Sequence, residues 1–548
     1  MPELLNLRNA GVKGINSDVK PWELEAEYMT SGANFRIFAG AIRASGGSNT
    51  WTTATAPNLI ADELGNLVVD ELGNQLVDSL GGTFNPGFIL PVASTSADYW
   101  IAAGRNDVQV FDGATWTSIA STEGYNGVGA GDELNWTGCM LGSIPVINNP
   151  QAQPEVWVPQ SPGQILTPLQ WDAANTWQDK GFSFKVIRSH KNFLFALNLT
   201  EGATELPNSY RWSTAADING LPFTWDETDL SALAGKAQIG GDAGTIIDGL
   251  SLRDAFAIYS ENAITMLDFT ADEFVWKARE LSSTIGLLAK DCVTEVKGTH
   301  FFLSDGDIVR NDGNKIDSII HNRLRRRLAS GISEATFTNS FTVRNNALKE
   351  VWFCVPEEDA IYPNVAYVYN WKDDSWAIRD LPEAGVAFAA YGSQAEATTT
   401  WDAWDGSWEE QQGVWGSRQI TPLDDTVIGV DSTTSSLIEL DPALPTTDLG
   451  TVIERTDFPL EGHRQVTTIT RLYPHIEGAG MLDIQVGSQD YAGAPIRWQP
   501  PQRFTPGVDR KLDVRTTGEL HCWRLLSVGT ISFDFSGMDV EYSRSGLR

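Results

Sequence analysis

The sequence has few cysteines, few basic side chains and no long apolar run. Its 548 residues include four Cys, and 39 Lys and Arg stand against 71 Asp and Glu, for a formal net charge of −32. No stretch reaches the roughly 18 consecutive apolar residues that a membrane span requires. The cysteines form no C-x-x-C pair, so neither a zinc knuckle nor a disulfide framework is indicated. The acidic excess argues against a basic nucleic-acid-binding domain.

No familiar catalytic or cofactor-binding pattern stands out either. The six His residues show neither H-E-x-x-H nor H-x-H spacing, and there is no G-x-S-x-G nucleophile elbow. Gly127 to Gly131 and Gly235-Lys236 lack the context of a dinucleotide or Walker site, and Asp305 to Asn314 lacks EF-hand spacing, so all three are expected to be loops or turns. We therefore predict no enzyme, no cofactor and no bound metal, although counting leaves room for a glycosidase pair among the 71 acids.

Short apolar runs rich in β-branched and aromatic residues predict a chain of the all-β class. Examples begin at Phe193, Ala255, Thr299, Glu350 and Val365, and each run has about four to seven residues. Asp-Gly and Asn-Gly dipeptides lie between the runs and favour tight hairpins. The predicted topology is an antiparallel meander.

Recurring turns bounded by aromatic residues predict a β-propeller. Phe111 to Trp116, Tyr369 to Trp376 and Trp404 to Trp408 each combine an aromatic residue, an Asp turn and a returning Trp. Such a turn would close an outer hairpin of a blade, with its aromatics packed across the two strands. At roughly 40 to 45 residues per blade, about six blades fit the chain and leave room for additional β-sandwich-like domains.

Acidic residues are concentrated before residue 451. The stretch 451–548 is nearly neutral, whereas residues 1–450 carry almost the whole acidic excess. This shift follows a proline-containing linker from Asp441 to Gly450, which marks the predicted domain boundary. The N-terminal residues contain no apolar core of signal-peptide length, so we expect synthesis in the cytoplasm without export.

Two segments are predicted to be insertions. Asp62 to Asn66 recurs as Asp70 to Asn74, which predicts an acidic hairpin repeat over 62–78, either a surface excursion or a tip that touches a channel or partner. Residues 401–416 contain four Trp between glycines that argue against a helix. Packing of a thin β-subdomain is favoured over stacking on sugars for these Trp residues.

The predicted organisation has five parts. They are N-terminal strands that join the propeller or a platform (1–50), an inserted acidic hairpin repeat (51–90), the propeller (91–400), a Trp-rich insertion with its linker (401–450), and a C-terminal β domain for docking (451–548).

Four separated parts of the sequence carry a further pattern. The first runs from Gly14 to Leu24 and is followed by Asn34-Phe-Arg36; the others run from Pro207 to Asp226, from Ile246 to Asp268 and from His521 to Tyr542. In this order they resemble the tail hub, or nozzle, proteins of short-tailed bacteriophages, the packaged-DNA stabilisation protein family. That family typically begins with Gly-Ile/Leu-Asn-x-Asp, then Pro and Glu-Leu, then an Asn-Val-Arg-like strand.

The resemblance implies a β-propeller fused to other β domains in a virion tail protein. It implies a homohexamer below the portal-adaptor ring, bound to tail fibres or spikes, with a channel in which DNA is retained and through which it is ejected. DNA would pass without sequence-specific binding, and no catalysis is implied. The segments 62–78 and 401–416 have no counterpart in the family pattern.

The acidic excess suggests how such a channel would work. Carboxylates lining the lumen would repel DNA phosphates and prevent sticking, so the channel would act as a slide. The near-neutral C-terminal part lacks this repulsion, and we expect it to dock onto neighbours, adaptor or fibres.

One segment, Asp317 to Gly331, is predicted to be a helix because it has an Asp cap, apolar residues near helical spacing and a terminal Gly. It holds the densest basic cluster of the chain, which consists of Arg323, Arg325, Arg326 and Arg327. These arginines would either pair with carboxylates of a neighbouring subunit or grip DNA, and the subunit contact is favoured.

Two other functions stay open. A carbohydrate-binding or carbohydrate-cleaving propeller would use exposed Trp and paired carboxylates, which accounts for the 20 Trp but leaves the N-terminal pattern unexplained. A cytosolic propeller scaffold is the other alternative.

Overall fold

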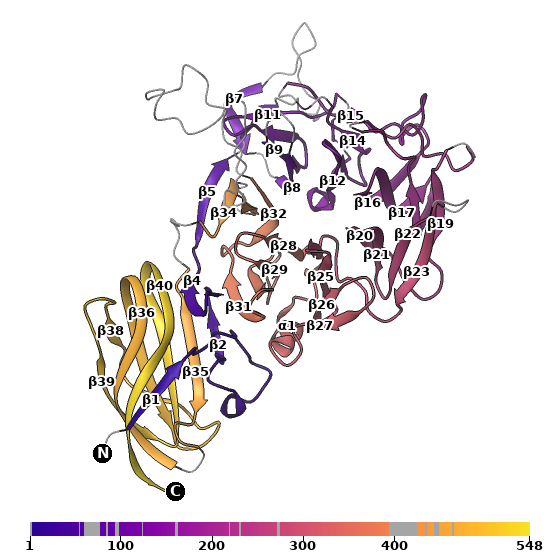
Figure 1. The fold of residues 1–548 in the computed structure, drawn as a ribbon. Coiled ribbons are helices and arrows are strands. Elements are labelled where there is room, and N and C mark those ends of the chain that lie inside the picture. The colour runs from indigo at the N-terminus through magenta and orange to yellow at the C-terminus, as the bar shows by residue number, and fades with distance from the viewer. Residues whose placement is uncertain are drawn as a thin grey trace, which may run out of the picture.

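Small β-sheets form a ring in the computed structural model, and a larger sheet lies against the rim of that ring (Figure 1). No helix among the described residues is long and apolar enough to cross a membrane. The structure describes residues 3–53, 55–59, 77–83, 86–93, 98–122, 124–125, 127–158, 160, 163–218, 220–229, 232–270, 275–393, 425–432, 434, 436–442, 449–462 and 465–547.

The ring is a seven-bladed β-propeller, and each blade is an antiparallel four-stranded sheet. The first strand of each blade contacts the first strand of the next, so these strands surround the axis. From the axis outwards, the blades are blade 1, β8 (Pro86–Ala93), β9 (Asp98–Gly104), β10 (Val108–Phe111) and β11 (Trp116–Ser118); blade 2, β12 (Thr137–Leu141), β13 (Ile144–Asn148), β14 (Glu155–Val156) and β15 (Thr167–Pro168); blade 3, β16 (Phe182–His190), β17 (Phe193–Glu201), β18 (Thr204–Trp212) and β19 (Gly235–Gln238); blade 4, β20 (Ile246–Leu252), β21 (Ala255–Ser260), β22 (Ile264–Phe269) and β23 (Trp276–Ser282); blade 5, β24 (Val293–Val296), β25 (Thr299–Ser304), β26 (Asp307–Asn311) and β27 (Ile316–Ser318); blade 6, β28 (Phe341–Asn345), β29 (Glu350–Val355), β30 (Val365–Asn370) and β31 (Ser375–Asp380); and blade 7, β32 (Val386–Ser393), β33 (Asp425–Asp431), β34 (Ser436–Leu440) and β5 (Ser48–Thr53).

The predicted all-β class and propeller are confirmed, but the predicted number of about six blades is wrong. The prediction of about six blades assumed that all blades have the same length. Blade 5 extends from Val293 to Ser318, whereas the loops of blade 3 stretch it from Phe182 to Gln238. A repeat length taken as constant therefore miscounts the blades.

The seventh blade is closed by a strand from the other end of the propeller sequence. β5 is its outermost strand and pairs antiparallel with β34, where Leu440 lies opposite Ser48. Because β5 comes before blade 1 in the chain, this pairing joins the first and last parts of the ring.

Neighbouring blades cover the middle strands on both faces, which explains their uninterrupted apolar runs. Every side chain from Phe193 to Leu197 in β17 is buried. The ring of Phe195 stacks on Phe256 of blade 4, with centroids 4.3 Å apart. Burial of each such large apolar side chain contributes about 1.5 to 3 kcal/mol, so the contacts between blades hold the ring.

Two of the Asp-Gly turns close outer hairpins, whereas Asp305-Gly306 joins the second and third strands of blade 5. Asp112 joins β10 to β11, and its Oδ1 accepts the backbone N–H groups of Ala114 and Thr115. The following Gly113 has φ +96°, a left-handed conformation that favours glycine. Asp312 makes the same turn between β26 and β27.

The larger sheet is built around two very long strands, β36 and β40, which pair along most of their length. Gly478 and Gly537 have φ +123° and +140°, and they lie next to irregularities in this pairing. The ten strands of this sheet are β1 (Glu3–Arg8), β2 (Ser31–Ala33), β3 (Phe35–Phe38), β4 (Ala41–Ala44), β35 (Val452–Phe458), β36 (Gln465–Gln489), β37 (Arg497–Trp498), β38 (Gln502–Phe504), β39 (Leu512–Gly518) and β40 (Leu520–Leu547).

Both ends of the chain therefore contribute to one sheet, which we call the terminal sheet. β1 pairs with β40, so Glu3 lies opposite Tyr542. The remaining elements are the pair β6 (Thr55–Leu59) and β7 (Val77–Thr83), the helix α1 (Arg325–Gly331), and 3-10 helices at Pro21–Glu23, Asp132–Asn135 and Phe337–Asn339. The repeated segments Asp62–Asn66 and Asp70–Asn74 and the Trp-rich segment 401–416 lie outside the described residues.

Asn34 ties the terminal sheet to blade 6. Its side-chain NH2 group donates to Asp380 Oδ2 at 2.8 Å and to the carbonyl oxygen of Leu449 at 2.7 Å, and its Oδ1 accepts the backbone N–H of Asp380 at 2.8 Å. Its own carbonyl accepts the hydroxyl of Thr451 at 2.8 Å. One buried amide thus connects the N-terminal segment, the propeller and the start of the C-terminal strands.

A buried charge network lies beside Asn34. The carboxylate of Asp441 is paired with the guanidinium groups of Arg36 and Arg379, and Arg36 Nε also lies 3.4 Å from Glu350 Oε1. Burial would raise the pKa of Asp441, but the two arginines lower it; for Glu350, burial prevails and raises the pKa. Arg379 also donates to the carbonyl oxygens of Gly46 and Gly47. We call Asn34, Arg36, Glu350, Arg379 and Asp441 the junction cluster.

Arg36→Met should lower the free energy of unfolding by about 3 to 5 kcal/mol, because it leaves buried carboxylates short of a partner. Arg43→Met, in the next strand, is the matched control. Arg43 pairs with Asp534 at a site where both side chains are about a third exposed. The Arg43→Met substitution should therefore lower the free energy of unfolding by only about 0 to 1 kcal/mol. Denaturant unfolding followed by tryptophan fluorescence measures both; equal losses would contradict the role of the junction cluster.

Candidate functional site

The predicted arginine cluster lies in the connection between blades 5 and 6, but the helix there is shorter than predicted. α1 covers Arg325–Gly331, while Asp317, the expected cap, belongs to β27 and lies beside Lys315 and Arg310. The expected helix start fails because β27 pairs with β26 through Asp317 and its neighbours.

The N-terminal segment supplies the cap that the sequence near the helix lacks. Both carboxylate oxygens of Asp18 accept backbone N–H groups, from Arg325 at 2.9 Å and from Arg326 at 3.0 Å. Asp18 is positioned by Asn16, whose Oδ1 accepts the Asp18 N–H at 3.2 Å. Gly14 has φ +77° and lies so close to Trp376 of blade 6 that a Cβ would meet its carbonyl oxygen. The segment from Gly14 to Asp18 therefore docks onto the propeller and caps α1.

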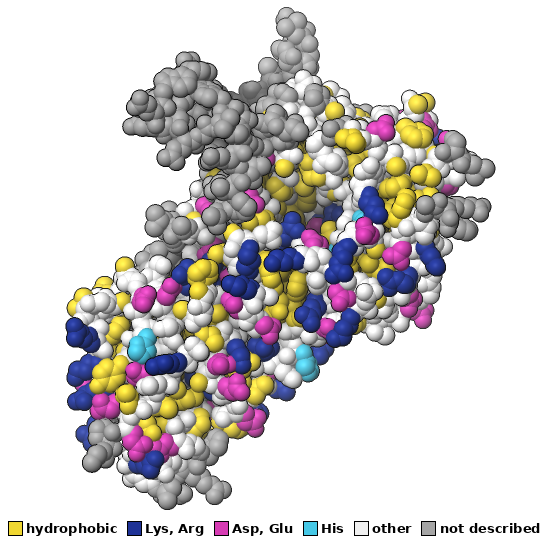
Figure 2. Space-filling model, in the orientation of Figure 1, with side chains coloured by type: hydrophobic (Ala, Val, Ile, Leu, Met, Phe, Trp, Pro, Cys, Tyr) yellow, Lys and Arg dark blue, Asp and Glu magenta, His cyan; other side chains and the backbone are white. Residues whose placement is uncertain are grey.

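The four arginines have different surroundings. Arg323 is mostly covered, since it lies 3.3 Å from Asp374 and its guanidinium stands over the ring of Tyr28. Arg325 is half exposed and lies 3.7 Å from Asp307, whereas Arg327 is near Tyr367. Arg326 is exposed. The structure thus pairs Arg323 and Arg325 within the chain, and Arg325 and Arg326 present charge to solvent. Figure 2 shows basic side chains over both the propeller and the terminal sheet of this acidic chain.

A second charged cluster lies among the inner strands of the propeller. Arg188 of β16 donates to Asp248 of β20 at 2.8 and 2.9 Å and to Asp291 at 2.6 Å. Lys290 donates to Asp291 at 2.7 Å and to the Trp136 carbonyl at 3.0 Å. Burial would raise the pKa of Asp291, but Lys290 and Arg188 lower it. A glycosidase acid needs a raised pKa, so Asp291 is suited to cross-linking blades rather than to donating a proton.

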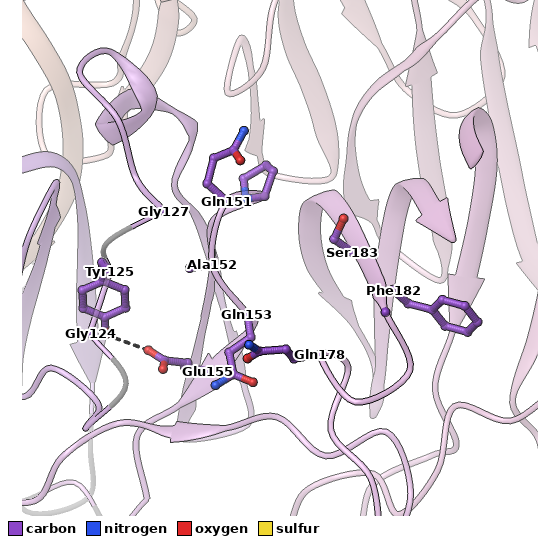
Figure 3. Close-up of a pocket in the computed structure, with 12 residues that line it drawn as sticks. Gly124, Tyr125, Gly127, Gln151, Ala152, Gln153, Glu155, Gln178, Phe182 and Ser183 are labelled. Carbon is purple, nitrogen blue, oxygen red and sulfur yellow. Dashed lines mark hydrogen bonds between the residues drawn. The ribbon is translucent and has the colours of Figure 1, made fainter. Parts of the chain in front are cut away.

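A pocket of about 450 Å³ opens at blade 2, between three connecting loops (Figure 3). Tyr125 lies at one side, and its hydroxyl donates to Glu155 Oε2 at 2.7 Å. Burial, followed by Glu155, raises the pKa of Tyr125 well above its usual range. Figure 3 shows Gln153 and Gln178 next to Glu155, with Ser183 opposite and the ring of Phe182 pointing away.

The chemistry of this pocket favours a hydroxyl-rich ligand. Its lining contains amides, the hydroxyl of Ser183, glycine backbone and the carboxylate of Glu155, which accepts the Tyr125 hydroxyl, and no Lys, Arg or His. An amide offers a donor and an acceptor side by side, which matches neighbouring hydroxyl groups of a sugar. From the sequence, Gly127 to Gly131 is interpreted only as a loop, because no motif links the pocket residues, which converge from three separate loops.

His190, His300 and His521 are buried, as are three of the four cysteines, whereas His321 and His475 are exposed. His300 bonds the hydroxyl of Tyr259 at 2.7 Å, and burial lowers its pKa to about 4. Burial raises the pKa of the Cys139 thiol to about 12. No three His, Cys, Asp or Glu side chains gather as a metal site would require in the part of the chain that the structure describes.

Comparisons with known proteins identify a fold but no family. No family model and no curated protein matches the sequence. Among solved structures, the chain is similar to the exo-β-1,3-galactanase of Phanerochaete chrysosporium with galactose, at 9% identity over 90% of this chain and 100% of the other, with a TM-score of 0.25. It is also similar to the WD40 domain of Neurospora crassa Pan2, at 6% identity over 66% of this chain and 90% of the other, with a TM-score of 0.34.

The prediction that this chain is not an enzyme is corrected by these comparisons, because the structures that it resembles include those of a carbohydrate-cleaving enzyme. At this identity and TM-score, the similarity concerns the fold and assigns no reaction. What the structure itself shows is the propeller, its charged clusters and the pocket at blade 2.

Asp18→Ala should destabilise α1 by about 1 kcal/mol, because two backbone N–H groups lose their acceptor. The measurement is limited trypsin digestion, in which cleavage within Arg323–Arg327 should become faster. Asp317→Ala is the control, since Asp317 contacts only exposed cations and does not cap the helix. Equal digestion rates in Asp18→Ala and wild type would contradict the capping role.

Proposed function

We propose that this chain is a tail hub subunit of a short-tailed bacteriophage, part of a homohexameric ring in the virion tail through which DNA is retained and ejected. The observation that supports this most is the position of the residues that carry the resemblance. Gly14, Asn16 and Asp18 dock the N-terminal segment onto blade 6 and α1, and Asn34 and Arg36 belong to the junction cluster. A ring subunit under pressure from DNA needs its two β bodies fixed to one another, and these residues do that.

Surface chemistry supports assembly with neighbours. Several large apolar side chains are exposed on loops in the described part of the chain, and a contiguous group of them would form a contact surface. The side chain of Ile218 is 90% exposed and that of Phe223 64% in blade 3, while Val508 is 75% and Tyr491 61% exposed in the terminal sheet. The terminal sheet would dock onto the portal-adaptor ring or the tail fibres.

The acidic surface fits a passage for DNA. With a net charge of −32 per chain, a ring of such subunits repels phosphates wherever carboxylates reach the lumen, so DNA would slide without sequence-specific binding. Arg325 and Arg326 would face a neighbouring subunit.

The test is reconstitution of tails. Wild-type chain added to particles that lack this protein should restore rings below the adaptor, seen by electron microscopy, and should restore DNA retention. Arg325→Glu with Arg326→Glu should reduce ring formation. Particles that retain and eject DNA equally well without the chain would contradict the hub function.

The pocket at blade 2 favours a second candidate, a carbohydrate-binding propeller. Gln151 and Gln178 line the pocket and are exposed, so they can reach sugar hydroxyls. Titration with soluble oligosaccharides should then show saturable binding, weakened about tenfold in Gln151→Ala/Gln178→Ala by the loss of two hydrogen bonds. Gln238→Ala, on an exposed strand of blade 3, is the control. Absence of binding across a broad glycan panel would exclude this candidate, and release of reducing ends would indicate cleavage.

A further inference from the structure

One charged side chain lines the pocket at blade 2, and its charge is negative. Glu155 is the one Asp, Glu, Lys, Arg or His in the described lining of this pocket. It belongs to β14 and is 1% exposed, so its carboxylate lies in the wall of the pocket rather than on the open surface (Figure 3). A ligand that enters the pocket therefore meets a buried negative charge among neutral polar groups.

The hydrogen bond from Tyr125 leaves this negative charge in place. The Tyr125 hydroxyl donates to Glu155 Oε2 at 2.7 Å. Burial and the neighbouring carboxylate raise the pKa of Tyr125, so the phenol keeps its proton and donates without adding a positive charge. The remaining polar groups of the lining are amides, the hydroxyl of Ser183 and the backbone, which are also neutral. The lining as a whole is therefore negative.

Lysines that are close in sequence do not reverse this charge. Lys180 and Lys185 are exposed and do not belong to the lining. Lys180 Nζ lies 3.6 Å from Asp172 Oδ2, so its charge is balanced on the surface. Asp179, which directly follows Gln178 of the lining, is exposed and adds another carboxylate nearby. The surroundings of the pocket thus favour a ligand with a positive group.

We infer that the pocket binds an amino sugar, a sugar that carries a protonated amino group beside its hydroxyl groups. A buried carboxylate is stabilised when an opposite charge comes close, because the interior screens their attraction only weakly. An ammonium group has three donors. One can be directed to Glu155, and the amide oxygen of Gln178, which lies next to Glu155 in Figure 3, can accept another.

The other polar groups of the lining suit the hydroxyl groups of the same sugar. Figure 3 shows Gln151 and Ser183 away from Glu155, so they can contact the part of the ring that does not carry the amine. The inference deepens the carbohydrate-binding candidate and rests on it, because it names the class of sugar that this pocket selects.

The lining favours an amino sugar over a lysine or arginine side chain of a partner protein. The long apolar stem of such a side chain needs apolar surface around it. The ring of Phe182 points away from the pocket and packs on Trp171, with centroids 5.2 Å apart. Pro150 and Ala152 are the aliphatic side chains that remain. A cavity of about 450 Å³ that is poor in apolar contacts fits a compact ring with many polar groups.

The experiment is isothermal titration calorimetry of the full-length chain with three tetrasaccharides, of glucosamine, of N-acetylglucosamine and of glucose. The glucosamine tetrasaccharide should bind about tenfold or more tightly than the other two, because its ammonium makes charge-assisted hydrogen bonds. This preference should disappear when the pH is raised until the sugar amine is neutral. Since the chain has a net charge of −32, enough NaCl is added to screen exposed charges, and one site per chain is expected.

Two matched substitutions locate the preference. Glu155→Gln removes the charge while its amide oxygen can still accept the Tyr125 hydroxyl, and it should lower the affinity for the glucosamine tetrasaccharide to that for the N-acetylated one. Glu205→Gln makes the same chemical change at an exposed position of β18 outside the lining, and it should bind like wild type. Circular dichroism establishes that both variants are folded; if Glu155→Gln is not, the pH dependence of the wild-type chain decides.

The possible results separate this inference from the candidate on which it rests. If wild type binds all three tetrasaccharides equally, the carbohydrate-binding candidate stands and the inference falls. If no saccharide binds, both fall. Equal weakening in Glu155→Gln and Glu205→Gln would assign the preference to the acidic surface and overturn the inference. Binding of Nα-acetyl-lysine amide as tight as that of the glucosamine tetrasaccharide would also overturn it, in favour of a basic side chain of a partner protein.

Discussion

The carboxylate of Asp441, buried between Arg36 and Arg379, is the interaction on which the arrangement of this molecule depends. Arg36 comes from the N-terminal strands, Arg379 from blade 6, and Asp441 from the segment after the last strands of blade 7. The pairing of these three residues therefore fixes the terminal sheet against the propeller. If these residues were separated, each charge would be buried without a partner of opposite charge, at a cost of several kcal/mol. The two bodies are thus held by a contact that tolerates little displacement.

Charged side chains also connect distant segments inside the propeller. Arg188 joins Asp248 and Asp291 from successive parts of the ring, and Asp18 reaches from the N-terminal segment to α1. Apolar packing between blades supplies most of the cohesion, but it is not directional, whereas a buried ion pair accepts only one geometry. Charges that the composition presents as a mere acidic excess therefore act partly as internal connectors.

Separate regions of the surface are suited to different functions. The pocket of blade 2 suits a hydroxyl-rich ligand, and exposed apolar side chains stand on blade 3 and on the terminal sheet. Ring assembly and sugar binding would use different residues, so evidence for one does not depend on the other.

The sequence by itself determined the class of the fold, because strand and turn propensities are local: the apolar run at Phe193 and the Asp-Gly turn at Asp112 form what their neighbours in the chain dictate. Tertiary structure alone decided the count of seven blades, since it depends on the pairing of β5 with β34 across most of the chain. It also decided that Asp18 rather than Asp317 caps α1 and that Arg36 meets Asp441. These are contacts between residues far apart in sequence, and composition and spacing carry no information about which distant partners meet.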